Sequence, residues 1–368
     1  MRRIRKGLYL VFILSICLAC QKNNDKEYFN GKILNITDHT KNIKETTFKE
    51  LSLDGINYGF MSVYDSLMVF MNPKLKDCFF NVFNVKTGKD LGTFLHRGIG
   101  PNEVSAIHPI YQFFKENNDL KTLLFAINES ELIVWNISQS ITQRKTVIDT
   151  IIPYSWKEEN KGAYYQKIYR LNKDTLLAYI DAIPLNEKEA TLPFYQKRTI
   201  YSNKLLTDFP IYKEIIKNGN SSIIPEAFLS SCDALKPDGS RVAQAMRHLP
   251  QLNIINTQTG QVIGYRSKEG DHFSVFESEV KIKNYYIEAQ ADNNYIYATY
   301  YGKEAWGQND DISINTIHVF DWNGNLIQKI RTDKSIDRIA LDTVENRLYS
   351  IDLANDQVYY LDLNEIFN

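Results

Sequence analysis

The chain has 368 residues, with 43 basic and 44 acidic side chains, so its formal net charge is only −1. A chain with no excess of basic residues lacks the charge that neutralises phosphates, which argues against nucleic acid as a partner. Aromatic residues make up 12% of the chain, most of them tyrosine and phenylalanine, as half-buried β-sheet faces prefer.

The first segment of the chain predicts export. Four basic residues lie within residues 2–6, an apolar run covers residues 8–16, and small Ala19 precedes Cys20. This order resembles a bacterial lipoprotein signal peptide, in which residues 1–19 are removed and Cys20 becomes the lipidated first residue. The resemblance implies an exported lipoprotein of the cell envelope, held at the membrane by its N-terminal lipid.

Two other interpretations of this segment are a transmembrane anchor and an ordinary cleaved signal. An anchor needs about 20 apolar residues, whereas the polar run 21–27 follows Cys20 at once. Ordinary cleavage would leave Cys20 without a role. Cys17 departs from the leucine usual three residues before a lipidated cysteine. We predict lipidation at Cys20 and a polar tether over residues 20–43.

From Phe48 onward, short apolar runs alternate with turn residues, and helical periodicity is nearly absent. Hairpin turns are predicted at residues 86–88, 237–239, 258–260 and 322–324, each ending in glycine. Glycine adopts the positive φ that such tight turns need. Four antiparallel strands repeated around an axis form a propeller blade.

The spacing of these hairpins predicts six blades. They cover about residues 56–95, 104–152, 164–212, 226–266, 280–331 and 336–363. The last blade has only three strands of its own. The strand near residues 48–53 is expected to supply its fourth, outer strand, which closes the ring and removes exposed sheet edges. We assign an all-β, six-bladed β-propeller domain to residues 44–368; seven blades or a pair of β-sandwiches are the alternatives.

The first loop between blades carries the one recognisable motif. Residues 96–103 read His-Arg-Gly-Ile-Gly-Pro-Asn-Glu. With the lipoprotein start and the six-blade rhythm, this loop resembles the TolB-like six-bladed β-propeller lipoproteins, which often carry Gly-x-Gly-Pro-x-Glu after an arginine. Val104 stands where an aromatic residue is usual. The resemblance implies the fold, the export route and a binding role, and it brings no established reaction.

Arg97 and Glu103 in this motif have two interpretations. Either they pair with each other or with the backbone and hold the loop in place, or they project into a pocket at the tunnel mouth and bind a ligand. Trp306 is a third candidate contact, because it lies in the polar insertion 301–311 of a late blade.

No catalytic motif is recognisable. The sequence lacks His-Glu-x-x-His, Gly-x-Ser-x-Gly, a phosphate-binding loop and a Rossmann fingerprint. We therefore favour a module without a cofactor and without evident catalysis that binds an envelope protein or a glycan through one face.

One enzymatic alternative stays open. Glu103, Glu226 and Asp337 each lie near the start of an expected innermost strand. Three blades would then aim carboxylates at one axis and hold Ca²⁺, as oxygen ligands do. A water on that metal would attack a lactone or ester, as in the gluconolactonase-type propellers that this arrangement resembles. The other interpretation is that each acid is an ordinary loop residue, and a chelator that leaves the melting temperature unchanged would favour it.

Beyond the signal segment the chain has two cysteines, Cys78 and Cys232. They form either a disulfide in an oxidising compartment or two buried free thiols.

Overall fold

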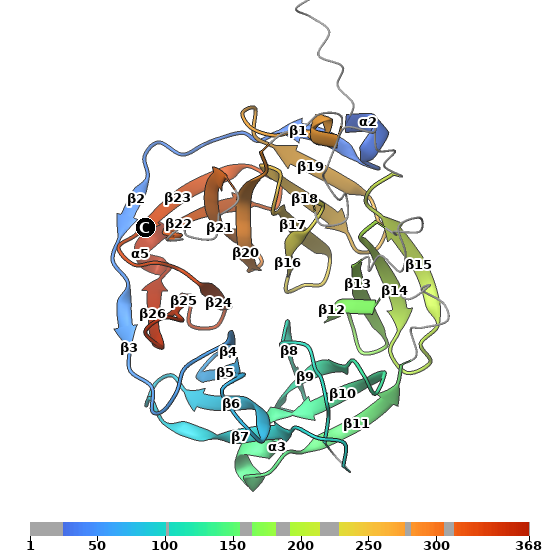
Figure 1. The fold of residues 1–368 in the computed structure, drawn as a ribbon, viewed down its shortest axis with the longest axis vertical. Coiled ribbons are helices and arrows are strands. Elements are labelled where there is room, and N and C mark those ends of the chain that lie inside the picture. The colour runs from blue at the N-terminus through green and yellow to red at the C-terminus, as the bar shows by residue number, and fades with distance from the viewer. Residues whose placement is uncertain are drawn as a thin grey trace, which may run out of the picture.

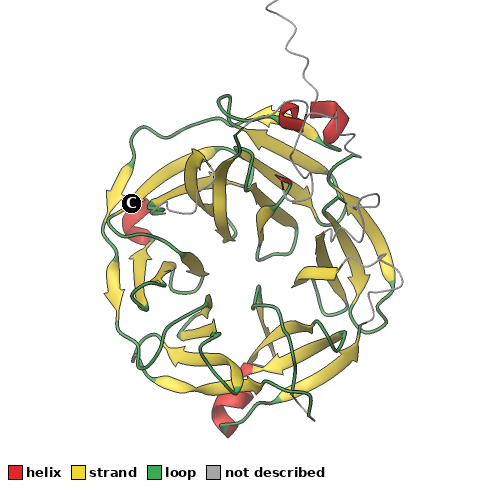
Figure 2. Cartoon of the chain, in the orientation of Figure 1, coloured by secondary structure: helices red, strands yellow, loops and turns green. Residues whose placement is uncertain are grey.

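The structure is a computed structural model, and it describes residues 25–100, 103–154, 164–181, 192–213, 228–276, 281–304 and 313–367. These residues form six sheets arranged as a ring around a central axis (Figure 1). Strands dominate, and the short helices α2, α3 and α5 lie on the outer rim (Figure 2). The predicted six-bladed β-propeller is confirmed.

In the first three blades the strands follow one another from the axis to the rim. Blade 1 consists of β4 (Phe60–Tyr64), β5 (Leu67–Met71), β6 (Cys78–Asn84) and β7 (Asp90–His96). Blade 2 consists of β8 (Phe113–Glu116), β9 (Asp119–Ala126), β10 (Glu131–Asn136) and β11 (Ile148–Pro153). Blade 3 consists of β12 (Tyr164–Arg170), β13 (Thr175–Asp181), β14 (Phe194–Thr199) and β15 (Leu205–Pro210).

The last three blades repeat this order and receive additional strands from the N-terminal segment. Blade 4 consists of β16 (Ser231–Leu235), β17 (Arg241–Met246), β18 (Gln251–Asn256) and β19 (Val262–Arg266). Blade 5 consists of β20 (Lys283–Ala291), β21 (Tyr295–Glu304), β22 (Thr316–Asp321) and β23 (Leu326–Thr332). Blade 6 has β24 (Arg338–Asp342), β25 (Arg347–Asp352) and β26 (Gln357–Asp362).

Helical structure in the described residues is limited to short elements. These are α2 (Asp25–Tyr28), α3 (Ile137–Gln143), the 3₁₀ helix η1 (Phe273–Phe276) and α5 (Asn364–Phe367). In the described part of the chain, no helix is both long and apolar enough to cross a bilayer.

Blade 6 is completed by the N-terminal strand, as the sequence predicted. Strand β3 (Lys49–Leu51) pairs antiparallel with β26 and places Leu51 opposite Val358. The preceding residue, Phe48, is buried, and its ring centroid lies 6.0 Å from that of Tyr359. Its backbone amide donates a hydrogen bond to the Asp333 carboxylate at 2.9 Å. The two ends of the chain therefore share one sheet, which closes the ring.

The segment from Asp25 to Thr46, which we call the N-terminal strap, differs from the expected tether. Its strands β1 (Lys32–Asn35) and β2 (Lys44–Thr46) pair in parallel with β19 and β23 as fifth strands of blades 4 and 5. In Figure 1 the strap follows the outside of the ring. Its apolar anchors are Tyr28 and Phe29, which are buried beside Phe273. From Asp25 onward, the strap is part of the propeller surface.

Six apolar clusters fill the six interfaces between neighbouring blades. Between blades 1 and 2, for example, the rings of Phe80 and Trp135 stack with centroids 5.1 Å apart. The predicted hairpin glycines help to shape these blades. Gly324 has φ +76°, and a Cβ added to it would meet the Tyr265 ring of blade 4.

The two cysteines lie in different blades as buried free thiols. Cys78 begins β6 in blade 1, and Cys232 lies on β16 in blade 4. The sequence left open a disulfide or two buried free thiols, and the structure has the free thiols.

The strap also carries a buried ion pair that generates a testable prediction. Arg266 is only 3% exposed, and its Nη1 lies 2.6 Å from the Asp25 carboxylate. Asp25→Ala should lower the free energy of unfolding by about 3 kcal/mol, because it leaves a buried guanidinium without its counter-charge. Glu27→Ala is the matched control, since Glu27 is exposed on the same helix turn. Urea unfolding measures both, and equal stability of the two variants would show that the strap is not locked at this point.

Candidate functional site: an axial cavity

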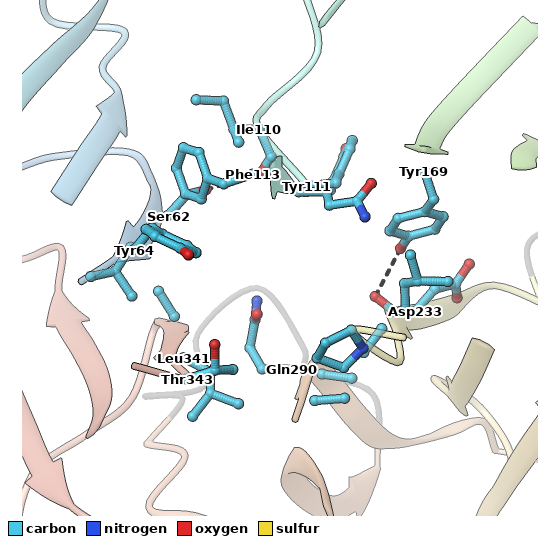
Figure 3. Close-up of a pocket in the computed structure, with 18 of the residues that line it drawn as sticks. Ser62, Tyr64, Ile110, Tyr111, Phe113, Tyr169, Asp233, Gln290, Leu341 and Thr343 are labelled. Atoms are coloured by element: carbon cyan, nitrogen blue, oxygen red, sulfur yellow. Dashed lines mark hydrogen bonds between the residues drawn. The ribbon is translucent and has the colours of Figure 1, made fainter. Parts of the chain in front are cut away.

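A cavity of about 210 Å³ lies on the ring axis. All six innermost strands, β4, β8, β12, β16, β20 and β24, contribute to its lining (Figure 3). Successive side chains of a strand point to opposite faces, so each inner strand presents only one or two side chains to the axis. The cavity is therefore assembled from residues that are far apart in the sequence.

Aromatic side chains form one wall of the cavity. Tyr64 and Phe113 meet edge to face with ring centroids 6.2 Å apart, and Tyr111 and Tyr169 lie 6.4 Å apart. Tyr111 is 37% exposed, so its side chain is accessible to a ligand in solution. Figure 3 shows these four side chains along one side of the cavity. All four offer apolar faces, and the three tyrosines add hydroxyl groups at their tips.

The opposite wall is largely aliphatic and carries two uncharged polar side chains. Gln290 points into the cavity beside Thr343 (Figure 3). The Gln290 amide nitrogen donates to the Ile339 carbonyl at 3.3 Å, and no donor in the described part of the chain reaches its amide oxygen. On the aromatic side, the Ser62 hydroxyl donates to the Ile110 carbonyl at 2.8 Å. The opposite wall thus keeps an acceptor for a ligand.

A buried carboxylate, that of Asp233, lies in the wall near Tyr169. Asp233 is 7% exposed and accepts hydrogen bonds from the Tyr195 hydroxyl at 2.5 Å and the Ser231 hydroxyl at 2.6 Å. The Tyr169 hydroxyl donates to the Asp233 backbone carbonyl at 3.2 Å, the dashed line in Figure 3. Burial by itself would lower the pKa of Lys167, but the surrounding acidic groups together, Asp233 first among them, raise that pKa. Lys167 therefore stays charged.

The other titratable groups near this wall are occupied by protein contacts. Burial raises the pKa of the Cys232 thiol to about 11, and the thiol donates to the Ile287 carbonyl. Burial likewise raises the pKa of Glu288, whose carboxylate pairs with Arg338 at 3.0 Å and accepts the Ile339 amide at 2.8 Å. The Cys232 contact joins blade 4 to blade 5, and the Glu288 contacts join blade 5 to blade 6. The described ranges contain no group of three or more histidine, cysteine or acidic side chains placed to hold a metal.

The motif residues Arg97 and Glu103 lie in the loop after β7 and make local contacts. The Arg97 Nε donates to the Cys78 carbonyl at 3.0 Å, and its guanidinium lies 4.0 Å from the Phe79 ring centroid. The Glu103 carboxylate accepts the Gly100 amide at 2.9 Å, and a Cβ on Gly98 would collide with it. These are the contacts of the loop-holding interpretation. Neither residue lines the axial cavity, and a role in ligand binding stays a prediction.

The remaining predicted site residues are only partly described. Cys20, Glu226 and Trp306 lie outside the described residues. Asp337 is half-buried, and its carboxylate accepts the Leu353 amide at 2.7 Å. Because Glu226 lies outside the described residues, the Ca²⁺ alternative stays a prediction.

The sequence profile of the TolB-like six-bladed propeller family matches residues 38–344. The chain belongs to this family. No curated protein sequence matches the chain significantly.

Solved structures share the fold of this TolB-like propeller at low sequence identity. A DUF4221 family member from Bacteroides vulgatus has a TM-score of 0.56 at 12% identity, covering 85% of this chain and 94% of that one. A Bacteroides fragilis protein provisionally described as exported has a TM-score of 0.54 at 12% identity, covering 87% and 88%. Regucalcin, a calcium-binding protein from Agrobacterium tumefaciens, reaches 0.46 at 12% identity, covering 87% and 95%, which is too low to argue from. These likenesses concern the fold alone.

Sequence analysis did not nominate the side chains that line the axis of this TolB-like propeller. A signal was nevertheless present: Lys167 and Asp233 are charged residues inside short, otherwise mostly uncharged and aromatic or aliphatic strands. Burying an unpaired charge costs free energy, so a charged residue in a buried strand indicates a partner of opposite charge elsewhere in the chain. The sequence does not show that Lys167 on β12 and Asp233 on β16 belong to neighbouring blades, because the order of the blades around the ring decides this.

The coupling between Lys167 and Asp233 is testable. Lys167→Met keeps most of the aliphatic stem and removes the charge, and we expect the free energy of unfolding to fall by about 2 kcal/mol. In the double variant with Asp233→Asn, the loss should be smaller than the sum of the two single losses, because the carboxylate no longer needs compensation. Urea unfolding of all four proteins measures this, and strictly additive losses would contradict the coupling.

Proposed function

We propose that this TolB-like propeller is a lipid-anchored binding module of the cell envelope that receives part of a protein ligand in its axial cavity. The observation that carries the proposal is the lining of that cavity by all six blades, with an exposed tyrosine among its residues. A closed ring holds these side chains on rigid strands, as a preorganised binding site requires. Of the two ligand classes expected from the sequence, a protein or a glycan, we propose a protein segment for this cavity.

The chemistry of the cavity favours a side chain or a short turn of a protein. An aromatic wall suits an apolar or aromatic side chain, and the free acceptor of Gln290 suits a backbone amide. Asp233 is the one charged side chain among the residues that line the cavity, and its carboxylate already accepts hydrogen bonds from Tyr195 and Ser231, so the cavity favours an uncharged group. Because Cys232 keeps its proton and Glu288 is paired, the groups nearest the cavity support binding over catalysis.

The lipid anchor would hold the ring close to the membrane. Four residues separate Cys20 from Asp25, which makes five Cα-to-Cα steps, and at Asp25 the strap is already paired with Arg266. An extended chain of that length spans at most about 18 Å. Anchoring at Cys20 would therefore leave the α2 side of the ring within that distance of the lipid.

Lipidation is tested by Cys20→Ser, with Cys17→Ser as the matched control in the same segment. We expect Cys20→Ser to lose the acyl chains and partition into the aqueous phase, because the anchoring thiol is gone. Cys17→Ser should remain in the detergent phase. Phase partition and intact mass report both, and an acylated Cys20→Ser protein would refute the assignment.

Partner binding is tested by crosslinking and affinity capture from native envelopes with the full-length protein. A stoichiometric protein partner should be recovered with the wild type and reduced about tenfold with Tyr111→Ala, because buried tyrosines dominate interface energies. Tyr201→Ala is the matched control, since Tyr201 is 65% exposed and does not line the cavity. Equal recovery with all three proteins would remove the axial cavity from consideration.

A further inference from the structure

A second hollow, which we call the inter-blade groove, lies between blades 4 and 5 under the strap. It has a volume of about 660 Å³. The strap residues 35–38 form one side, residues 267–269 after β19 form another, and side chains of β20, β21, β22 and β23 line the rest. The groove shares no residue with the axial cavity. Its volume is in the range of small-molecule sites.

Three aromatic side chains line the groove, and their polar atoms have no hydrogen-bond partner among the described residues. His318 is only 8% exposed, and its ring stacks on Tyr300 with centroids 4.0 Å apart. The buried Nδ1 of His318 has no hydrogen-bond partner, and no described residue bonds its Nε2 or the hydroxyls of Tyr286 and Tyr300. Tyr286 is 2% exposed and lies 5.6 Å from Tyr300 between ring centroids. Buried polar atoms almost always have a partner, so the unpaired Nδ1 of His318 marks this cluster as a candidate ligand site.

Each of these three groups both donates and accepts hydrogen bonds. Burial, reinforced by the charge of Lys329, lowers the pKa of His318 to about 3, so its imidazole is neutral and carries one donor and one acceptor. Burial raises the pKa of Tyr286 and Tyr300, so both phenols keep their protons. Groups that donate and accept at once are complementary to ligand hydroxyls, which do the same.

The rim of the groove carries balanced charges. Asp38 of the strap pairs with Lys329 of β23 at 2.7 Å. Lys268 and Glu269 add one charge of each sign. A site with no net charge does not favour an ionic ligand, because an ion would enter without compensation for its lost hydration.

We propose that the inter-blade groove is a binding site for a neutral, hydroxyl-rich ligand, a short saccharide, held by His318, Tyr286 and Tyr300. The aromatic rings supply apolar faces for the sugar ring, and their polar atoms pair with its hydroxyls. The site is independent of the protein ligand proposed for the axial cavity. In this proposal the strap forms part of the binding site, because its residue Asp38 lies on the rim and pairs with Lys329 of blade 5.

The test is isothermal titration calorimetry of the full-length protein in detergent with cellobiose, maltose and N,N′-diacetylchitobiose. A sulfated disaccharide of the same size is the charged comparison. We expect at least one neutral disaccharide to bind at millimolar concentration or below, and the sulfated one to bind more weakly. Binding of none of the neutral sugars, or a preference for the sulfated one, would overturn the proposal.

The site is assigned by Tyr286→Phe and Tyr300→Phe. Each should weaken saccharide affinity about tenfold and leave the melting temperature unchanged, because the hydroxyl removed has no protein partner. Tyr111→Ala in the axial cavity should leave saccharide affinity unchanged, and the groove variants should leave capture of the protein partner unchanged. Unaltered affinity in both phenylalanine variants, or an equal loss in Tyr111→Ala, would place the saccharide elsewhere.

Discussion

Every blade of this propeller depends on being covered on both faces by its neighbours. A four-stranded sheet with two apolar faces is not stable alone, and the six clusters between blades bury those faces only when the ring is closed. Closure rests on β3, which arrives from the other end of the chain and pairs with β26. The anchoring of Phe48 beside Tyr359 therefore matters to all six blades, since an open ring would expose two apolar faces and an edge.

The same closure creates the two candidate sites. Six innermost strands meet at the axis and cannot fill it completely, so a small cavity remains whose lining comes from every blade. At the interface of blades 4 and 5, the apolar cluster gives way to Tyr300 and His318, whose polar atoms have no described partner. The first site is built from aromatic rings and aliphatic side chains, and the second from neutral polar groups beside the strap. Different ligands for the two follow from this difference in chemistry.

Local rules made much of the fold predictable. Alternating apolar residues and glycine-ended turns identify hairpins within ten or twenty residues, and the three-stranded last blade required a strand from elsewhere. The strap was misjudged because its apolar residues, Tyr28, Phe29 and the few that follow, do not alternate regularly and lie among many polar residues. The motif pointed to Arg97 and Glu103, whose contacts with Cys78, Phe79 and Gly100 hold a crossing loop.

The sequence by itself determined the class of the protein: an all-β ring of six blades, closed by its N-terminal strand, in the TolB-like family. The blades and the closing strand follow from periodicity and turn chemistry, which act between near neighbours in the chain, whereas the family follows from the likeness of the sequence to its profile. Only the tertiary structure decided which side chains share a site. Lys167 and Asp233, or Tyr300 and His318, become neighbours through strand pairing and blade packing. The first pair belongs to two different blades and depends on the ring, whereas the second lies on the paired strands β21 and β22 of one blade. In both cases the sequence alone does not show which side chains face each other, because strand register and blade packing decide it.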